Sequence, residues 1–338
     1  MKKLIAAFFI LTGLIILAAG GLYYYMQTFY DDKINSREPV IIDIPRGTSI
    51  SGAINAFNDK GLLRPGWVFE ASARIYSYSK GTGMKAGYYR FPDTLTNSDL
   101  IEAIFKGEFL YTVNITFPEG YSYKKYAQLA AEKMFFDENE FLRLCESDSL
   151  LSTRGIDAVN AEGYLLPDTY EFFANATAAN IVDRMLNARE SFFQDILAKD
   201  EYSLYKSVHE TLTLASIIEA ESPVDAEKRA ISGVYRNRLE IGMLLQADPT
   251  VQFALGEKRR LLYRDLEINN PYNTYKVTGL PPGPINNPGR ESIKAAMDPQ
   301  KHDYYYFVAV GDGSGMHNFA ETHAGHIRNI RIFKRNAR

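Results

Sequence analysis

The chain of 338 residues has little cysteine, since Cys145 is its single one. An intramolecular disulfide is therefore excluded even in an oxidising compartment. Cys145 falls in a helical pattern with Phe141 and Leu142, and we expect a buried, inert thiol rather than a nucleophile. Stability must come from a packed core.

An excess of one charge is also lacking. The chain has 38 Lys and Arg against 41 Asp and Glu, a formal net charge of −3. Nucleic acid is not predicted as a partner, because phosphate binding needs a concentrated basic face. No P-loop and no Gly-x-Ser-x-Gly elbow occurs. Gly311-Asp-Gly-Ser-Gly315 follows a predicted strand at 304–310 without a helix inside the motif, so it indicates a hairpin turn rather than a dinucleotide loop.

Histidines are few, and three of the five lie near the C-terminus: His317, His323 and His326. Neither cysteine nor a His-Glu-x-x-His pattern accompanies them, so we expect hydrogen-bonded or solvent-facing side chains rather than metal ligands. We predict no metal and no cofactor.

Charge is absent from residues 4–30, and two lysines precede them. The apolar part, 4–26, has the length of a bilayer span, about 20 residues. A cleaved signal peptide is the alternative, but its apolar region is shorter, about 7–15 residues. Lysines before the span and aspartates after it predict an inside N-terminus. We expect a cytoplasmic tail (1–3), a transmembrane helix (4–26) in contact with membrane lipid, a linker (27–37) and an extracytoplasmic remainder on the cytoplasmic (inner) membrane.

A small module is predicted at 38–112, beginning with an alternating strand at Val40–Ile44. The strand–turn–helix pattern recurs 73 residues later, because Ile44-Pro-Arg-Gly-Thr-Ser49 matches Phe117-Pro-Glu-Gly-Tyr-Ser122. We infer a related second unit at 113–150. The alternative is that two unrelated segments have converged on the same strand–turn–helix pattern.

Two glutamates lie on a predicted helix at 211–223 that is apolar on nearly every side and ends at Pro223. Apolar surroundings disfavour a charged carboxylate and raise its pKa, which suits a general acid near neutral pH. Alternatively, Glu219 or Glu221 pairs with a Lys or Arg. From periodicity alone these two interpretations are about equal.

The flanking regions differ in character. Residues 180–246 predict helices with a break near 200–202, and turns with short strands are expected after Pro249. Five prolines between 269 and 289 predict a rigid surface loop, and long loops in compact domains are often functional.

Several stretches together closely resemble the YceG-like family of endolytic murein transglycosylases. They follow the family's order over essentially the whole chain: Glu162-Gly163, Leu166–Tyr170, Leu214–Ser222, Tyr235–Met243, Leu245–Gln252, Tyr272–Tyr275, Gly279–Gly289, Tyr304–Val308 and Gly315–Phe319.

The resemblance implies an α+β protein: a transmembrane helix, a LysM-like module (38–112) that binds glycan, and a YceG-like catalytic domain (113–338). In the catalytic domain a helical lysozyme-like part precedes a loop-rich part with short strands. The implied reaction cleaves peptidoglycan between N-acetylmuramic acid and N-acetylglucosamine and leaves a 1,6-anhydro end. The expected partners are peptidoglycan glycan strands and peptidoglycan synthases.

The resemblance also distinguishes the two glutamates, because the family's catalytic residue is the second of the Glu-x-Glu pair. We predict Glu221 as catalytic, with Glu219 as the fallback. A single carboxyl suffices if it first protonates the glycosidic oxygen and then accepts the proton of the sugar's C6 hydroxyl, a nucleophile that is already tethered. A hydrolase would need two carboxyls.

Polar and aromatic residues on the loops around this helix are candidates for holding the sugar, with a purely structural role about equally expected for each. The substrate-binding candidates are Gln246, Asp248, Thr250, Gln252, Asn273, Tyr275, Asn287, Tyr164 and Tyr170. A catalytically silent glycan-binding scaffold is the alternative function, and ordinary muramidase hydrolysis is the third.

Overall fold

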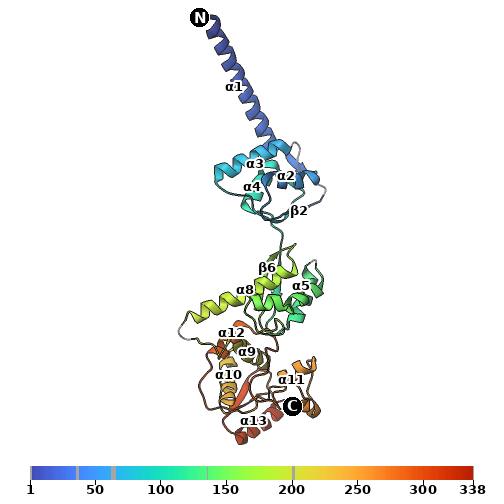
Figure 1. The fold of residues 1–338 in the computed structure, drawn as a ribbon, viewed down its shortest axis with the longest axis vertical. Coiled ribbons are helices and arrows are strands. Elements are labelled where there is room, and N and C mark those ends of the chain that lie inside the picture. Colours follow the sequence, from blue (N-terminus) through green and yellow to red (C-terminus); the bar gives the residue numbers. More distant parts are fainter. Residues whose placement is uncertain (1, 36–37, 62–65, 135, 200–201, 338) are drawn as a thin grey trace. The chain divides into compact units, whose positions relative to one another are not determined.

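The structure is a computed structural model that describes residues 2–35, 38–61, 66–134, 136–199 and 202–337. It has mixed α and β structure with an apolar N-terminal helix. The chain forms two compact units (Figure 1). Unit 1 contains Met1–Val113 and Phe172–Asn175, and unit 2 contains Asn114–Glu171 and Ala176–Arg338.

Helix α1 spans Lys2–Asp31 and therefore continues beyond the predicted end at residue 26. Its part from Phe8 to Asp31 is long and apolar enough to cross a membrane. The extension is helical because Phe29 is buried in the core of unit 1 and its carbonyl accepts a hydrogen bond from Asn97 Nδ2 at 2.9 Å. Met1 of the predicted tail and residues 36–37 of the predicted linker lie outside the described residues.

Two small antiparallel sheets and three helices complete unit 1. Strand β1 (Lys33–Asn35) pairs with β4 (Thr94–Thr96), and β2 (Val40–Ile44) pairs with β3 (Gly87–Phe91). The helices are α2 (Ile50–Asp59), α3 (Gly66–Lys80) and α4 (Asn97–Lys106). Alternate residues of β2, Ile42 and Ile44, are buried in the core, as the period of a half-buried strand requires.

The repeated sequence forms the same turn twice. Gly47 and Gly120 have φ angles of 83° and 73°, a left-handed conformation that glycine adopts without steric cost. Two residues later the side chains of Ser49 and Ser122 accept hydrogen bonds from the backbone and cap the helices that follow. The similarity that the sequence predicted at this turn is therefore present in the local geometry.

Unit 2 is mainly helical. Its elements are β5 (Thr112–Phe117), α5 (Tyr123–Lys133), α6 (Glu138–Cys145), α7 (Asp148–Thr153), β6 (Asp168–Phe173), α8 (Ala178–Leu197), α9 (Val208–Glu221), α10 (Asp225–Glu240), α11 (Asp248–Leu255), the 3₁₀ helix η1 (Tyr263–Glu267), α12 (Arg290–Met297), β7 (Tyr306–Ala309), β8 (His317–Ala320) and α13 (His323–Asn336). The ends of β5 and β6 extend into unit 1. Strands β5 and β6 pair with each other, and β7 and β8 form an antiparallel hairpin.

The structure corrects three sequence-based expectations. The helical region ends at Glu240 rather than 246 and is interrupted at 202–207 and at 222–224. Residues 200 and 201 of the predicted break lie outside the described residues. Helices also occur after Pro249, which itself lies in the first turn of α11, where the missing N–H of proline costs nothing. The hairpin at 311–315 is confirmed. The loop at 269–289 is irregular, as expected, but residues 283–289 are buried, so the expectation of a surface loop was wrong; this part of the loop bonds to Ser216 of the enclosed helix α9.

Helix α9 is the centre of unit 2. Every residue from Thr211 to Ile218 is buried, so the helix is enclosed on all sides. Figure 1 shows α10 and α12 close to it. The Ser216 hydroxyl of α9 accepts a hydrogen bond from the backbone N–H of Ile285, and the Ser216 carbonyl accepts one from the Asn286 side-chain amide. The proline-rich loop is thus held against α9 and positions the end of that helix.

Candidate active site

The glutamates at the end of α9 point in different directions. Residues two apart on an α-helix are separated by about 200° around its axis. Glu221 is the last residue of helix α9, and Ser222 is its C-cap. Glu219 lies toward α10 and α12, whereas Glu221 lies at the edge of a cavity.

Glu219 is bound within the protein. Its Oε2 atom is 3.3 Å from Lys228 Nζ in an ion pair in which both side chains are buried. The same oxygen accepts hydrogen bonds from the Ser292 hydroxyl at 2.6 Å and from the Gly289 N–H at 3.0 Å. These contacts join α9 to α10 and α12, so Glu219 is placed as a structural carboxylate.

Glu221 has a different environment. It lines a cavity of about 520 Å³, and its Oε1 atom accepts a hydrogen bond of 2.7 Å from the Tyr235 hydroxyl. The pKa of Glu221 is raised to about 7, because burial, together with the nearby Asp248 carboxylate, outweighs the Tyr235 hydrogen bond and the Arg238 charge, which lower it. A carboxyl with such a pKa is partly protonated near neutral pH, as a general acid must be.

The cavity is lined by residues of α9 and α10, of the segment 245–248, of the loop that carries Tyr275, and of β7, β8 and α13. Helices α9 and α10 contribute the acid and its partner, the loop before α11 contributes polar groups, and β7, β8 and α13 form an aromatic and histidine-rich wall. The lining residues are Glu221, Tyr235, Arg238, Leu245, Gln246, Asp248, Tyr275, Tyr306, Phe307, Val308, Ala309, His317, His323 and His326.

Three of the nine predicted substrate-binding residues line this cavity: Gln246, Asp248 and Tyr275. The Tyr275 hydroxyl donates a hydrogen bond of 2.6 Å to Asp248 Oδ1. Because this bond and burial both disfavour the phenolate, the pKa of Tyr275 is raised far above its ordinary value. Tyr275 is therefore a neutral donor that fixes the Asp248 carboxylate.

The other six candidates do not line the cavity, because their polar atoms bond within the protein. The Thr250 hydroxyl bonds to Thr274 and to a backbone carbonyl, the Gln252 amide donates to the Arg259 carbonyl, and the Asn273 amide donates to two loop carbonyls. These three side chains stabilise the loops beside the cavity.

Asn287, Tyr164 and Tyr170 are also buried. Asn287 donates to the Tyr121 carbonyl and to Glu162, and its own carbonyl oxygen accepts from the Leu165 N–H. The Tyr164 hydroxyl bonds to a histidine, and that of Tyr170 donates to a backbone carbonyl. Asn287 thus joins three loops.

Sequence reasoning missed Arg238, which connects two walls of the cavity. Its guanidinium donates to the Leu245 carbonyl at 2.6 Å and to the Tyr305 carbonyl at 2.7 Å. Burial lowers its pKa from the ordinary arginine value. Arg238 and Tyr235 lie one helical turn apart in the Tyr235-Arg-Asn-Arg238 stretch of α10, which was the signal available in the sequence.

The three C-terminal histidines were expected to be hydrogen-bonded or solvent-facing, and the structure brings them to the cavity wall. His317 Nδ1 lies 2.9 Å from Glu227 Oε2. The His326 ring stacks on Tyr306 with 5.3 Å between ring centroids. Burial lowers the pKa of His326, and the Arg238 charge lowers it further. Among the residues that the structure describes, no group of three His, Cys, Asp or Glu side chains has the geometry of a metal site.

A partly protonated carboxyl in an aromatic-lined cavity defines a site for general-acid chemistry on a polar substrate. Comparison with known proteins gives the family. Residues 42–332 match the model of the YceG-like family, and the chain belongs to this family, as its motifs predicted.

Named relatives support the assignment. The chain is 34% identical to a Bacillus subtilis protein named endolytic murein transglycosylase, over 82% of this chain and 81% of that protein. A Streptococcus pneumoniae protein of the same name is 29% identical, and the match covers 88% of this chain and 58% of that protein. A crystal structure of a yceG-like protein from Listeria monocytogenes has a TM-score of 0.56 at 33% identity, covering 87% of this chain and 99% of that one.

Proposed function

We propose that this protein is an endolytic murein transglycosylase, which cleaves peptidoglycan glycan strands between N-acetylmuramic acid and N-acetylglucosamine and leaves 1,6-anhydro ends. The observation that carries the proposal is the environment of Glu221, a carboxyl with a pKa raised to about 7 at the edge of an aromatic-lined cavity. The names of the relatives support the substrate and the lytic outcome.

In the proposed reaction the protonated Glu221 carboxyl gives its proton to the glycosidic oxygen as the bond from that oxygen to C1 breaks. The Glu221 carboxylate then takes the proton of the C6 hydroxyl while O6 bonds to C1 of the same sugar. The acid is regenerated and no water is consumed. Because the nucleophile is tethered to the reacting carbon, the enzyme needs to orient the sugar rather than activate water.

The remaining cavity residues are proposed to hold and orient the sugar. Asp248 and Gln246 offer hydrogen-bonding groups to hydroxyl and acetamido substituents, and the rings of Tyr306 and Phe307 offer surfaces for the apolar face of a sugar. Tyr235 does not need to contact the substrate. Its hydroxyl orients the Glu221 carboxyl and lowers its pKa.

We further propose that α1 is a single-pass anchor in the cytoplasmic membrane with its N-terminus inside, so that unit 2 acts on the extracytoplasmic wall. Its length and apolar composition support this. Residues 38–112 are proposed as a LysM-like module that holds glycan strands, and synthases that make these strands are the proposed protein partners. Protease digestion of intact and lysed cells tests the orientation, and pull-down of purified sacculi by the chain tests glycan binding.

Digestion of purified sacculi, followed by mass spectrometry of the products, tests the activity. We expect the wild-type protein to release anhydro-ended fragments and Glu221→Gln to lose at least about 10²-fold in rate, the usual contribution of a general acid. Glu240→Gln, on an exposed position of α10, is the matched control and should retain activity. Undiminished cleavage by Glu221→Gln would remove Glu221 from the mechanism. Binding without any new ends would instead indicate a silent scaffold.

Ordinary muramidase hydrolysis is the second candidate, and one observation favours it: the Asp248 carboxylate lines the same cavity as Glu221. Two carboxyls across a glycosidic bond could activate or replace water. Hydrolysis would give reducing muramic ends, whose mass exceeds that of the anhydro product by one water. The same mass spectra therefore decide between the two reactions.

A further inference from the structure

Helix α3 carries an unusual exposed face. Trp67, the single tryptophan of the chain, is 64% exposed, Ile75 is 59% exposed and Tyr78 is 93% exposed. Trp67 and Tyr78 are eleven residues apart, three turns along one stripe of the helix, and Arg74 lies between them on the same stripe. The opposite side of α3, with Phe69 and Ala73, packs into the core of unit 1.

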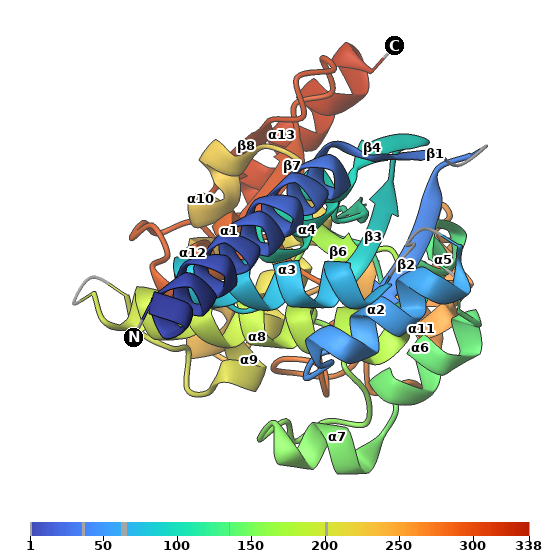
Figure 2. The same cartoon turned by 90° about the horizontal axis from the view of Figure 1, so that it is seen from above.

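The position of α3 relative to α1 is fixed within unit 1. The rings of Phe29 in α1 and Phe69 in α3 pack edge to face with 6.5 Å between centroids. Figures 1 and 2 show α3 on the side of unit 1 from which α1 projects, running across the direction of α1. Since the buried side of α3 faces the core, its exposed face points toward that same side.

The distance between the Phe29–Phe69 contact and the end of the apolar stretch of α1 follows from the helix rise of about 1.5 Å per residue. Phe29 follows Met26, the end of the apolar stretch, by three residues, which is roughly 5 Å along α1. The headgroup layer on each side of a bilayer is about 5–7 Å thick. If α1 spans the membrane, as proposed above, Phe29 and therefore α3 lie at the level of the lipid headgroups.

The composition of the exposed face suits that level. Tryptophan and tyrosine rings are enriched at membrane interfaces because one end is apolar and the other polar. Arg74 on the same stripe is paired with Glu70 at 2.6 Å, so the aromatic rings rather than a net positive charge carry the argument. An amphipathic helix lying in the interface plane has this pattern. In water this face would expose the large side chains of Trp67, Ile75 and Tyr78 to solvent, and their apolar surface would not stabilise the fold.

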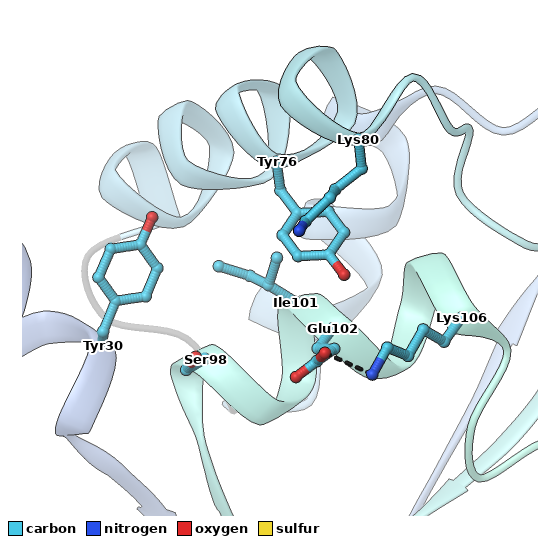
Figure 3. Close-up of a pocket in the computed structure, with 7 residues that line it drawn as sticks. All are labelled: Tyr30, Tyr76, Lys80, Ser98, Ile101, Glu102 and Lys106. Atoms are coloured by element: carbon cyan, nitrogen blue, oxygen red, sulfur yellow. Dashed lines mark ion pairs between the residues drawn. The ribbon is translucent and has the colours of Figure 1, made fainter.

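A pocket beside the end of α1 has a complementary character. It has a volume of about 480 Å³ and lies between α1, α3 and α4 (Figure 3). Its lining combines apolar surface with hydroxyl and amine groups and one carboxylate, from Tyr30, Tyr76, Lys80, Ser98, Ile101, Glu102 and Lys106, and Lys106 pairs with Glu102 at 2.5 Å. Lys80 and the hydroxyl groups are donors of the kind that bind phosphate-bearing headgroups.

We propose that the exposed face of α3, defined by Trp67, Arg74, Ile75 and Tyr78, lies in the headgroup region of the outer leaflet and docks unit 1 on the bilayer. The partner is the phospholipid surface itself, because α1 continues without a break into the core that carries α3. Unit 1 is then held against the membrane by two helices, one across it and one along its surface.

Because Trp67 is the single tryptophan, its fluorescence reports on this face without any substitution. The full chain is reconstituted in vesicles of neutral and anionic phospholipid and recovered by flotation. We expect strong quenching by lipids brominated near the top of their acyl chains, weaker quenching by lipids brominated near the methyl ends, and little quenching by aqueous iodide.

A control moves the tryptophan to a water-facing site in unit 2. It combines Trp67→Phe with Tyr263→Trp, because Tyr263 is 92% exposed and belongs to the other unit. Its tryptophan should be quenched by iodide several-fold more than Trp67 and not by the brominated lipids. Trp67→Phe combined with Tyr78→Trp, which keeps the same stripe, should behave as the wild-type chain does.

Each other result overturns the proposal. Iodide quenching of Trp67 equal to that of the control would place the face in water. Protection from both iodide and brominated lipid would mean that protein, a second copy or another partner, covers it. Stronger quenching by the deeper bromines would place it in the hydrocarbon, and failure to float would remove the anchor on which the inference depends. None of these readouts involves strand cleavage, so they leave the transglycosylase proposal to its own test.

Discussion

Substitution of Tyr235 by phenylalanine changes the acid without removing it. The Tyr235 hydroxyl donates to Glu221 Oε1 at 2.7 Å and lowers the pKa of that carboxyl by stabilising its charged form. A hydrogen bond to a charged group contributes about 1.5–3 kcal/mol, and one pKa unit corresponds to about 1.4 kcal/mol. Tyr235→Phe should therefore raise the Glu221 pKa by about one to two units.

The consequence for activity follows from the form that reacts. A general acid must be protonated, so cleavage should be maximal below the Glu221 pKa and should fall as pH rises through about 7. In Tyr235→Phe the alkaline decline should move to higher pH by about one to two units, with activity retained at lower pH because the hydroxyl is not the proton donor.

The assay is the initial rate of anhydro-fragment release from sacculi as a function of pH. The matched control is Tyr126→Phe, which removes another buried hydroxyl of unit 2, one that donates to the Pro118 carbonyl at 2.7 Å. This control should leave the midpoint of the alkaline decline unchanged. An unchanged or lowered midpoint in Tyr235→Phe would refute the assignment of that decline to Glu221.

Three further predictions use other groups of unit 2. Asp248→Asn removes a negative charge that raises the Glu221 pKa, so the alkaline decline should move to lower pH, opposite to Tyr235→Phe, in the same rate assay. Glu219→Gln leaves the buried Lys228 amine with Asp225, 2.8 Å away and exposed, as its remaining ion-pair partner. It should therefore lower the free energy of unfolding by about 1–3 kcal/mol in denaturant titrations, whereas an unchanged value would argue against the ion pair with Glu219. Burial raises the Glu162 pKa to about 8, above its unfolded value of 4.5. Its contribution to stability is therefore full below pH 4.5 and is lost as pH rises through about 8. In Glu162→Gln the free energy of unfolding, measured by denaturant titration at a series of pH values, should lose this pH dependence, a slope of about 1.4 kcal/mol per pH unit.

Local signals in the sequence predicted the strand at Val40–Ile44 and the turn that recurs 73 residues later, and helix ends in unit 1 are set by equally local contacts. Thr96 and Ser49 accept hydrogen bonds from backbone N–H groups of the helices they precede, and Gly107 ends α4 in a left-handed conformation. Each of these features depends on residues within one turn of the chain, so the sequence alone contains the necessary information. The extension of α1 to Asp31 depends instead on tertiary packing of Phe29, which periodicity cannot reveal.

The candidate site was less accessible from sequence, because polar residues on loops have the same composition whether they face a cavity or another loop. Asn287 and Gln246 illustrate this. The Asn287 amide bonds to Glu162, which is 125 residues away, whereas Gln246 lines the cavity. Likewise Tyr235 meets Glu221 only because α10 packs beside the end of α9. Such pairings are set by the arrangement of helices and are absent from any local pattern.

The spacing of the Glu-x-Glu pair explains how one helix end can carry an unpaired acid. Two carboxyls two residues apart on a helix cannot both enter one cavity, because they are about 200° apart. Glu219 binds Lys228 of α10 and Ser292 of α12 and so fixes the rotation of α9. Glu221 is then directed to the cavity at the C-terminal end of the helix, where the partial negative charge of the backbone further disfavours a carboxylate. The ion pair at one position thus permits a neutral carboxyl at the other.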